Sequence, residues 1–121
     1  MDVFAETPTH CSHVYVSVNF IQSNDILKRE LLSRPIVYYI EFGPDDYEDA
    51  DLGTTLGFLR GKVAALLREN EFLAKHNQKL NYLQGDRLDL FKKKRLLTQD
   101  REFLCNMDVN TGDTLTCIAQ I

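Results

Sequence analysis

Histidine and cysteine side chains gather near the start of the chain, where His10, Cys11 and His13 occur close together. Imidazole and thiolate groups are common zinc ligands, and zinc needs about four of them in a tetrahedral arrangement. A fourth ligand would have to come from a distant residue such as Cys117, and the paired Cys-x-x-Cys element of many zinc sites is missing. We therefore expect surface histidines, small buried cysteines and no metal site.

A second group of possible ligands is the acidic run over residues 45–51, which contains Asp45, Asp46, Glu48, Asp49 and Asp51. A calcium loop needs a defined ligand spacing and a central glycine, and this run has neither, so we expect a solvated loop. The chain also shows no glycine-rich phosphate loop, nucleophile motif or paired acid arrangement. We therefore expect no enzymatic activity and no cofactor.

Four consecutive basic residues, Lys92, Lys93, Lys94 and Arg95, follow Phe91. They could face water, contact an acidic protein or contact RNA. RNA-binding surfaces interleave aromatic side chains with basic ones, and nothing aromatic interleaves with this run. The net charge of −4 also argues against a nucleic-acid partner. We keep the four residues as a secondary basic contact for a protein partner.

The composition is that of one globular domain, with 121 residues, 44% hydrophobic and 26% charged. There is no apolar run long enough to cross a membrane, and the acidic first residues do not form a signal peptide. The three cysteines are an odd, widely spaced set, which favours a reducing compartment over a disulfide framework. We expect a cytoplasmic or nuclear protein without a membrane partner.

Two stretches of alternating apolar residues predict the first two strands. The residues that share a face are Val14, Val16, Val18 and Phe20 in the first strand, and Ile36, Tyr38, Ile40 and Phe42 in the second. Residues 22–34 between them are predicted to form an enlarged loop with a short helical turn. Residues 1–10 are predicted to be a flexible tail, which leaves residues 11–121 as the domain.

The main helix is predicted to begin at Thr54 or Thr55, which are good N-caps. The apolar residues that follow at helical spacing are Leu56, Leu59, Val63, Leu66 and Leu67. We expect this helix to continue past Glu69 towards Lys75. Gly57 and Gly61 lie four residues apart on one side of it, which indicates close packing or simple tolerance.

The last third of the chain predicts three more strands. They cover residues 87–90 and 96–97, separated by a basic turn over 91–95, and a final strand whose inward residues are Leu115, Cys117, Ala119 and Ile121. The order ββαβββ is an α+β pattern in which a mixed sheet packs on one main helix.

This order and the C-terminal third of the chain resemble ubiquitin and other β-grasp proteins. The matching residues are Arg87-Leu88, the basic turn, Leu97, Leu104, Val109 and Asp113-Thr114-Leu115, with no gap from Thr98 to Ile121. The resemblance implies a ubiquitin-like fold with strand order 2-1-5-3-4. These are mostly core and turn positions, so the likeness says more about the scaffold than about function.

Three departures from ubiquitin bear on function. The chain ends at Ile121 without the di-glycine tail of conjugated relatives, so we expect a non-conjugated protein. The isoleucine, histidine and valine of ubiquitin's binding patch correspond to Asp89, Thr116 and Ile118. A carboxylate there disfavours the usual ubiquitin receptors, because burying an unpaired charge is costly. The turn after Phe91 also lacks the proline of related domains that bind a hexameric ATPase, so that partner is not expected.

The resemblance implies an outer sheet face on which Tyr39, Tyr15, Ile118 and Asp89 line up in one row. With Thr116, these residues are the candidate partner-binding site. Two tyrosines and an isoleucine around a carboxylate suit a partner with an apolar anchor and a basic group. Scattered surface apolar residues are the alternative explanation.

The sequence therefore predicts a protein-binding adaptor module that is monomeric outside a complex. The alternative is a structural subunit of a larger assembly, ribonucleoprotein or cytoskeletal. Such a subunit would contact its partners through the 22–34 loop and the basic 92–95 turn.

Overall fold

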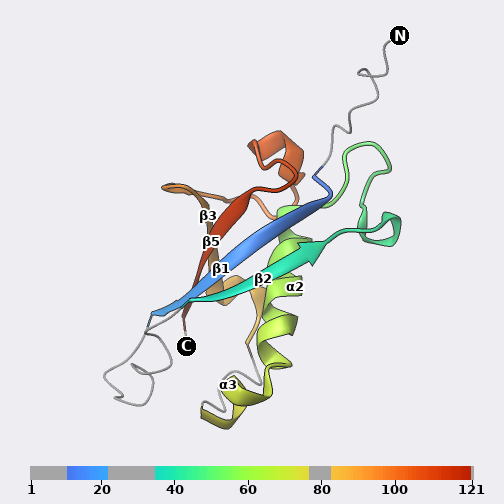
Figure 1. Ribbon diagram of the computed structural model, residues 1–121. Coiled ribbons are helices and arrows are strands. Elements are labelled where there is room, and N and C mark those ends of the chain that lie inside the picture. The colour runs from blue at the N-terminus through green and yellow to red at the C-terminus, as the bar shows by residue number, and fades with distance from the viewer. Residues whose placement is uncertain (1–10, 22–34, 77–82, 121) are drawn as a thin grey trace.

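A mixed five-stranded sheet lies across one long helix in the computed structural model, which describes residues 11–21, 35–76 and 83–120 (Figure 1). The strands are β1 His13–Ile21, β2 Ile36–Glu41, β3 Leu88–Lys92, β4 Arg95–Leu96 and β5 Thr114–Gln120. The helices are α2 Leu56–Arg68 and α3 Glu71–His76. Short 3-10 helices are η2 Pro44–Asp46, η4 Gly85–Arg87 and η5 Leu104–Met107.

The strand order is β2-β1-β5-β3-β4. β1 runs parallel to β5, and the pairs β1–β2, β3–β5 and β3–β4 are antiparallel. The order of elements is ββαβββ when α2 is taken as the main helix. The predicted α+β class, the ubiquitin-like β-grasp topology and the packing of the sheet on α2 are therefore confirmed.

The core lies between the sheet and α2, and every second residue of the central strands contributes to it. Its fully buried side chains include Val14, Val16 and Val18 from β1, Leu88 and Leu90 from β3, and Leu115, Cys117 and Ala119 from β5. From α2 they meet Leu56, Leu59, Val63 and Leu67. Burying one such aliphatic side chain contributes about 1.5–3 kcal/mol. The predicted inward set is confirmed, except Ile121, which lies outside the described residues.

The main helix begins as predicted but ends earlier. The Thr55 hydroxyl accepts a hydrogen bond from the Phe58 N–H at 3.3 Å. The prediction of one helix towards Lys75 was wrong, because α2 ends at Arg68 and α3 begins at Glu71. Between them the Asn70 side chain accepts a hydrogen bond from the Leu73 N–H at 3.1 Å, and asparagine favours such caps over helix interiors.

The basic turn is shorter than predicted. β3 continues to Lys92 and β4 begins at Arg95, which pairs with Lys92, so only Lys93 and Lys94 connect them. Lys93 has a positive φ of 57°, as two-residue hairpin turns require. Three residues of the predicted five-residue turn therefore belong to the strands, namely Phe91, Lys92 and Arg95.

Two predictions fall on parts of the chain that the structure does not describe. They are the flexible tail over residues 1–10 and the enlarged loop over residues 22–34. Among the residues described, no helix combines the length and apolar character that crossing a membrane would require.

Candidate functional site

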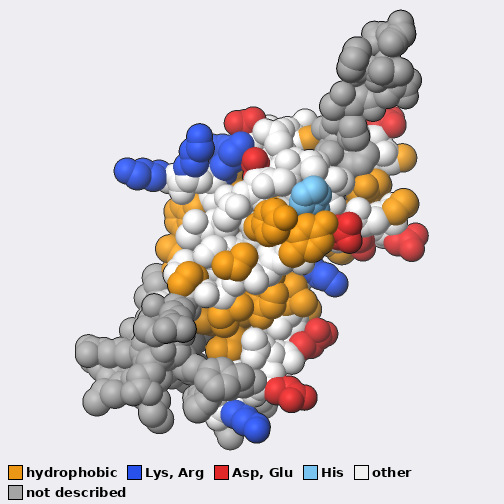
Figure 2. All heavy atoms as spheres, in the orientation of Figure 1, with side chains coloured by type: hydrophobic (Ala, Val, Ile, Leu, Met, Phe, Trp, Pro, Cys, Tyr) orange, Lys and Arg blue, Asp and Glu red, His pale blue; other side chains and the backbone are white. Residues whose placement is uncertain are grey.

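The sheet has a second face, on the side away from α2, that no described residue covers. Its side chains alternate with those of the core. They are His13, Tyr15, Ser17 and Asn19 from β1, Val37, Tyr39 and Glu41 from β2, Thr114, Thr116 and Ile118 from β5, Asp89 and Phe91 from β3, and Leu96 from β4. We call this surface the outer face, and Figure 2 looks onto it.

Exposed apolar side chains concentrate on the outer face. The large apolar residues exposed in the described part of the chain are Val37 at 59%, Tyr39 at 50%, Leu96 at 45% and Tyr15 at 39%. All four lie on this face, and Figure 2 shows hydrophobic side chains grouped across it. Randomly scattered surface residues would also fall on the helix side, so the distribution favours one apolar surface over the alternative of isolated exposed residues.

Three rings form the centre of this surface. The ring centroids of Tyr15 and Tyr39 are 5.3 Å apart, and His13 lies 5.3 Å from Tyr39 and 6.1 Å from Tyr15. We call these residues the aromatic cluster. Partial burial raises the pKa of Tyr39, and the hydrogen bond and charge of Glu41 raise it further. Packed rings with polar tips are typical anchors of protein interfaces.

His13 is a member of this cluster that the sequence analysis did not assign to the site. The sequence indicated a zinc ligand or an ordinary surface histidine at this position. The same alternation that turns Tyr15 outward also turns His13 outward, and the β1–β2 register places it opposite Glu41. The period-two pattern could therefore have identified it.

The predicted single row of Tyr39, Tyr15, Ile118 and Asp89 was wrong. Tyr15 pairs with Tyr39 on β2, but its partner on β5 is Thr114. Ile118 lies opposite Asn19 and Asp89, four residues further along β5, which is about 13 Å. The parallel register is the reason, because it sets Val16 beside Leu115 and Val18 beside Cys117 in the core.

Four of the five predicted residues therefore form two groups on the same face. Tyr15 and Tyr39 lie in the aromatic cluster, and Asp89 and Ile118 lie together near the far end of β5. Thr116 lies between the groups, opposite Ser17 on one side and Phe91 on the other.

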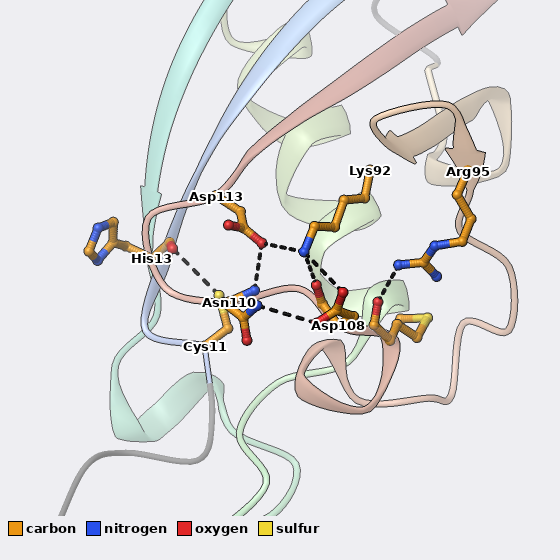
Figure 3. Close-up of polar contacts among 8 residues, drawn as sticks. Cys11, His13, Lys92, Arg95, Asp108, Asn110 and Asp113 are labelled. Atoms are coloured by element: carbon orange, nitrogen blue, oxygen red, sulfur yellow. Dashed lines mark hydrogen bonds and ion pairs between the residues drawn. The ribbon is translucent and has the colours of Figure 1, made fainter. Parts of the chain in front are cut away.

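Two of the four residues of the predicted basic contact, Lys92 and Arg95, bind other groups of the same chain. The Lys92 ammonium lies 3.1 Å from the Asp113 carboxylate and 3.4 Å from that of Asp108, and it also donates to the Asp108 carbonyl (Figure 3). The Arg95 guanidinium donates to the Met107 carbonyl at 2.6 Å. These contacts hold the β3–β4 hairpin against the loop that precedes β5.

The charges in this group stabilise one another. The hydrogen bond to Asp113 is the main cause that raises the pKa of Lys92. The charge of Lys92 is the main cause that lowers the pKa of Asp108. Lys93 and Lys94 are exposed and form no ion pair with a described residue, so they are the part of the predicted basic contact that remains available.

His13 and the described cysteines do not converge on a metal site. The Cys11 thiol is buried and donates to the His13 carbonyl at 3.4 Å, whereas the His13 ring lies in the aromatic cluster. Cys117 points to the inner face, so the sheet separates it from that ring. Burial raises the pKa of Cys11 to about 11 and that of Cys117 to about 12. The described residues hold no group of three candidate ligands, and His10 lies outside them.

The acidic run after β2 builds turns with its carboxylates. Asp46 accepts a hydrogen bond from the Gly43 N–H at 2.9 Å. Asp49 accepts from the N–H groups of Asp51 and Leu52 at 2.8 and 3.0 Å. The run therefore shapes the connection from β2 to α2 and keeps negative charge beside the end of β2.

Comparisons with known proteins find proteins that are similar to this chain in structure or in sequence. A search of solved structures finds Caldiarchaeum subterraneum ubiquitin at 20% identity and a TM-score of 0.48, covering 90% of this chain and 95% of that chain. A curated relative is Ergosterol biosynthesis protein 29 of Saccharomyces cerevisiae, which is 30% identical over 128 aligned positions covering 96% of this chain. The chain spans about half the length of that relative, 52%.

The model of one protein family, described as the ERG29 C-terminal domain, matches residues 9–119. That match covers α2, the sheet as far as Ala119 and the residues of the outer face named above. This chain therefore belongs to the ERG29 C-terminal domain family.

Proposed function

We propose that this chain is a non-catalytic, ubiquitin-like module that binds a protein partner through its outer face. The observation that carries the proposal is the position of Tyr15, Val37 and Tyr39 side by side on β1 and β2, with Leu96 across the same uncovered face. Exposed apolar surface of this kind is typical of interaction sites. An ordered sheet presents it without the entropy cost of arranging a loop.

The partner's surface should carry an apolar anchor and a basic group. The aromatic cluster offers apolar ring area to the anchor, and polar side chains such as Ser17, Thr114 and Thr116 surround it with hydrogen-bonding groups. Glu41 beside the cluster and Asp89 near Ile118 supply the negative charges. This division into an apolar centre and a polar rim is common at non-obligate interfaces.

We propose that the binding serves sterol biosynthesis, because the family includes a relative named Ergosterol biosynthesis protein 29. In this role the module is an adaptor that holds a partner and carries out no reaction itself. We also propose that it acts in a reducing compartment, the cytoplasm or nucleus, where its three free thiols would persist.

The alternative role, a structural subunit contacting partners through two loops, has less support. Lys92 and Arg95 of the basic run, which this role would present to a partner, make internal contacts. The proposal is therefore based on the outer face.

Affinity purification followed by mass spectrometry tests the proposal. The bait is compared with Tyr15→Ala/Tyr39→Ala and with the control Lys62→Ala, which changes an exposed residue of α2. Removing two interface aromatics should weaken partner recovery at least about tenfold, since each such anchor contributes about 2 kcal/mol or more. The control should recover the partner normally.

The same variants are then introduced into cells in place of the wild-type protein, and sterol intermediates are measured. The double variant should accumulate intermediates and the control should not. Equal recovery of partners by the folded double variant and the wild type would reject the outer face as the binding surface. A normal sterol profile despite lost binding would reject the link to sterol biosynthesis alone.

A further inference from the structure

The backbone of β2 has one side that pairs with β1 and one side at the edge of the sheet. The Phe42 N–H donates to the Ser12 carbonyl at 2.9 Å. Ser12 and Phe42 are therefore a hydrogen-bonded pair of the antiparallel ladder between β1 and β2. Such pairs alternate along a ladder, so the even-numbered residues of β2 bond to β1. The backbone groups of Val37, Tyr39 and Glu41 therefore point away from the sheet, and they bond to no described residue.

This edge lacks the features that usually prevent pairing with another chain. β2 has six residues, Ile36–Glu41, with no lysine, proline or bulge among them. Protected edges are very short, or they carry lysine, proline or bulges. The opposite edge of the sheet, β4, has only two residues, Arg95–Leu96. Of the two edges, β2 is the one that can accept a full strand.

The chemistry around β2 defines what such a strand should carry. Glu41 ends β2 and is followed by the acidic run, whereas residues 36–59 contain no lysine, arginine or histidine. Figure 2 shows acidic side chains bordering the hydrophobic and histidine side chains on the right of the view. The side chains beside the free backbone groups are Val37, Tyr39 and Glu41, all on the outer face. A strand added there places its own outer side chains against a tyrosine ring and a carboxylate.

We propose that β2 accepts an extended segment of the protein partner as a sixth, antiparallel strand, whose basic side chains lie over Tyr39 and beside Glu41. A cation over the face of a tyrosine ring is attracted to it, and the carboxylate adds an opposite charge. Antiparallel pairing is the slightly more stable arrangement. This inference rests on the proposed function and adds to it the binding mode and the charge of the partner.

A second copy of this chain is a poorer occupant of the same edge. It would present its own β2, which contains Glu41 and no base. The acidic run of each copy would then find no positive partner in the added strand. Charge complementarity therefore selects a basic segment from another protein.

The first test uses a synthetic ten-residue peptide in which arginine and valine alternate. In the antiparallel arrangement the arginines lie on the outer face and the valines continue the inner face. Titration into the whole protein, followed by NMR, should slow exchange of the Val37 and Tyr39 amide protons, because these become hydrogen-bonded. Replacing the arginines of the peptide with glutamines should weaken binding about tenfold or more.

Two matched protein variants isolate the backbone contribution. Val37→Pro removes an N–H that faces the edge and leaves the β1–β2 ladder intact, since proline is tolerated at such positions. Val37→Ala removes the side chain and keeps the N–H. The proline variant should bind the peptide about tenfold more weakly than the alanine variant, because it loses a hydrogen bond and gains a clash.

A pair of modified peptides repeats the comparison on the unmodified protein, in case the proline variant does not fold. N-methylation of the arginine amides, which face β2 in the proposed pairing, should abolish binding. N-methylation of the valine amides, which face away, should leave it intact. Failure of the arginine–valine peptide to bind, equal binding by both methylated peptides, or peptide-independent protection of Val37 through self-association would each overturn the inference.

The outcome is separable from that of the proposed function. If a captured partner is lost from Tyr15→Ala/Tyr39→Ala but retained by Val37→Pro, the outer face binds and strand addition is rejected. If neither variant loses the partner, the proposed function fails together with this inference. Loss from both variants, with lower recovery by Val37→Pro than by Val37→Ala, supports both.

Discussion

At the scale of single residues, Lys92 shows how a charge that looked available can be committed within the fold. Its ammonium lies between the carboxylates of Asp108 and Asp113, and its side chain is only 16% exposed. In sequence it stands in a run with Lys93 and Lys94, and nothing local distinguishes it from them. The difference arises from strand alternation and from the loop that folds back over the hairpin.

Replacing Lys92 should lower stability in a way that depends on pH. Lys92→Met should unfold at lower temperature than the wild type near neutral pH, because two carboxylates lose their cation. The folded pKa of Asp108 is lowered, so its contribution is present above about pH 4 and lost as pH falls through that folded pKa. The folded pKa of Lys92 is raised, so its contribution holds below about pH 10 and is lost at higher pH.

Thermal unfolding of both proteins across pH measures this difference, with Lys93→Met as the control for loss of an exposed charge. The difference in unfolding temperature between wild type and Lys92→Met should be largest between about pH 4 and about pH 10. It should become smaller below and above that range. A gap that does not change with pH would mean that Lys92 stabilises the hairpin by packing alone.

Tyr38 provides a second test at this scale. Its hydroxyl is buried and has no hydrogen-bond partner among the described residues. Tyr38→Phe should therefore leave the free energy of unfolding unchanged or raise it by about 1 kcal/mol, since an unsatisfied buried hydroxyl is costly.

The matched control for Tyr38 is Tyr47→Phe. The Tyr47 hydroxyl donates to the Phe42 carbonyl at 3.4 Å, so its removal should cost about 0.5–1.5 kcal/mol. Urea denaturation measures both variants. A loss of more than 1 kcal/mol in Tyr38→Phe would show that its hydroxyl is bonded after all.

At the scale of elements, the start of α2 is fixed by a distant segment. The Leu56 N–H donates to the Glu102 carbonyl at 3.0 Å, and the Gly57 N–H donates to the Asp100 carbonyl at 2.9 Å. Helix N–H groups that lack partners within the helix are thus satisfied by the chain between β4 and η5. This contact requires close approach, and a side chain at Gly57 would meet the Asp100 carbonyl oxygen at 3.0 Å.

The two glycines of α2 should respond in opposite directions to the same change. Gly57→Ala should destabilise the protein by about 1–3 kcal/mol, because the backbone of Asp100 must move. Gly61→Ala meets no atom within 4 Å and should stabilise it by about 0.5–1 kcal/mol through better helix propensity. Chemical denaturation of the two variants measures the difference. Equal effects at the two positions would contradict the docking of the 99–102 segment on the helix.

The sequence predicts which strands and helices form better than it predicts where they end and how the strands pair. Alternation in β1, β2 and β5 correctly separated core from surface, since both faces are decided by local period-two patterns. The break at Asn70 depended on one side chain capping α3, which competes with an otherwise continuous helical pattern. The register of Tyr15 with Thr114 depended on how two distant strands pack against α2, and no local pattern encodes it.

The same limit explains the result for the candidate site. Each of its five predicted residues lies on the outer face, because the local alternation of each strand decides which face a side chain points to. Their division into two groups could not be predicted, because it depends on pairing across the sheet. Their role in binding stays a prediction.

At the scale of the whole molecule, charge is distributed unequally around the outer face. Lys93 and Lys94 project from the β3–β4 hairpin at one side, and Glu41 and the acidic run lie at the β2 side. Figure 2 shows basic side chains gathered at the upper left and acidic ones along the right. Such an arrangement can orient a partner as it approaches, and its effect should weaken as salt is added.

The most direct test of the central claim is cross-saturation NMR on the whole protein bound to its captured partner. We predict the strongest transfer at His13, Tyr15, Ser17, Val37 and Tyr39, with weak transfer along the exposed side of α2. The outer face would then be the contact surface. Transfer confined to α2 and the 99–102 segment, with none on β1 and β2, would contradict the account.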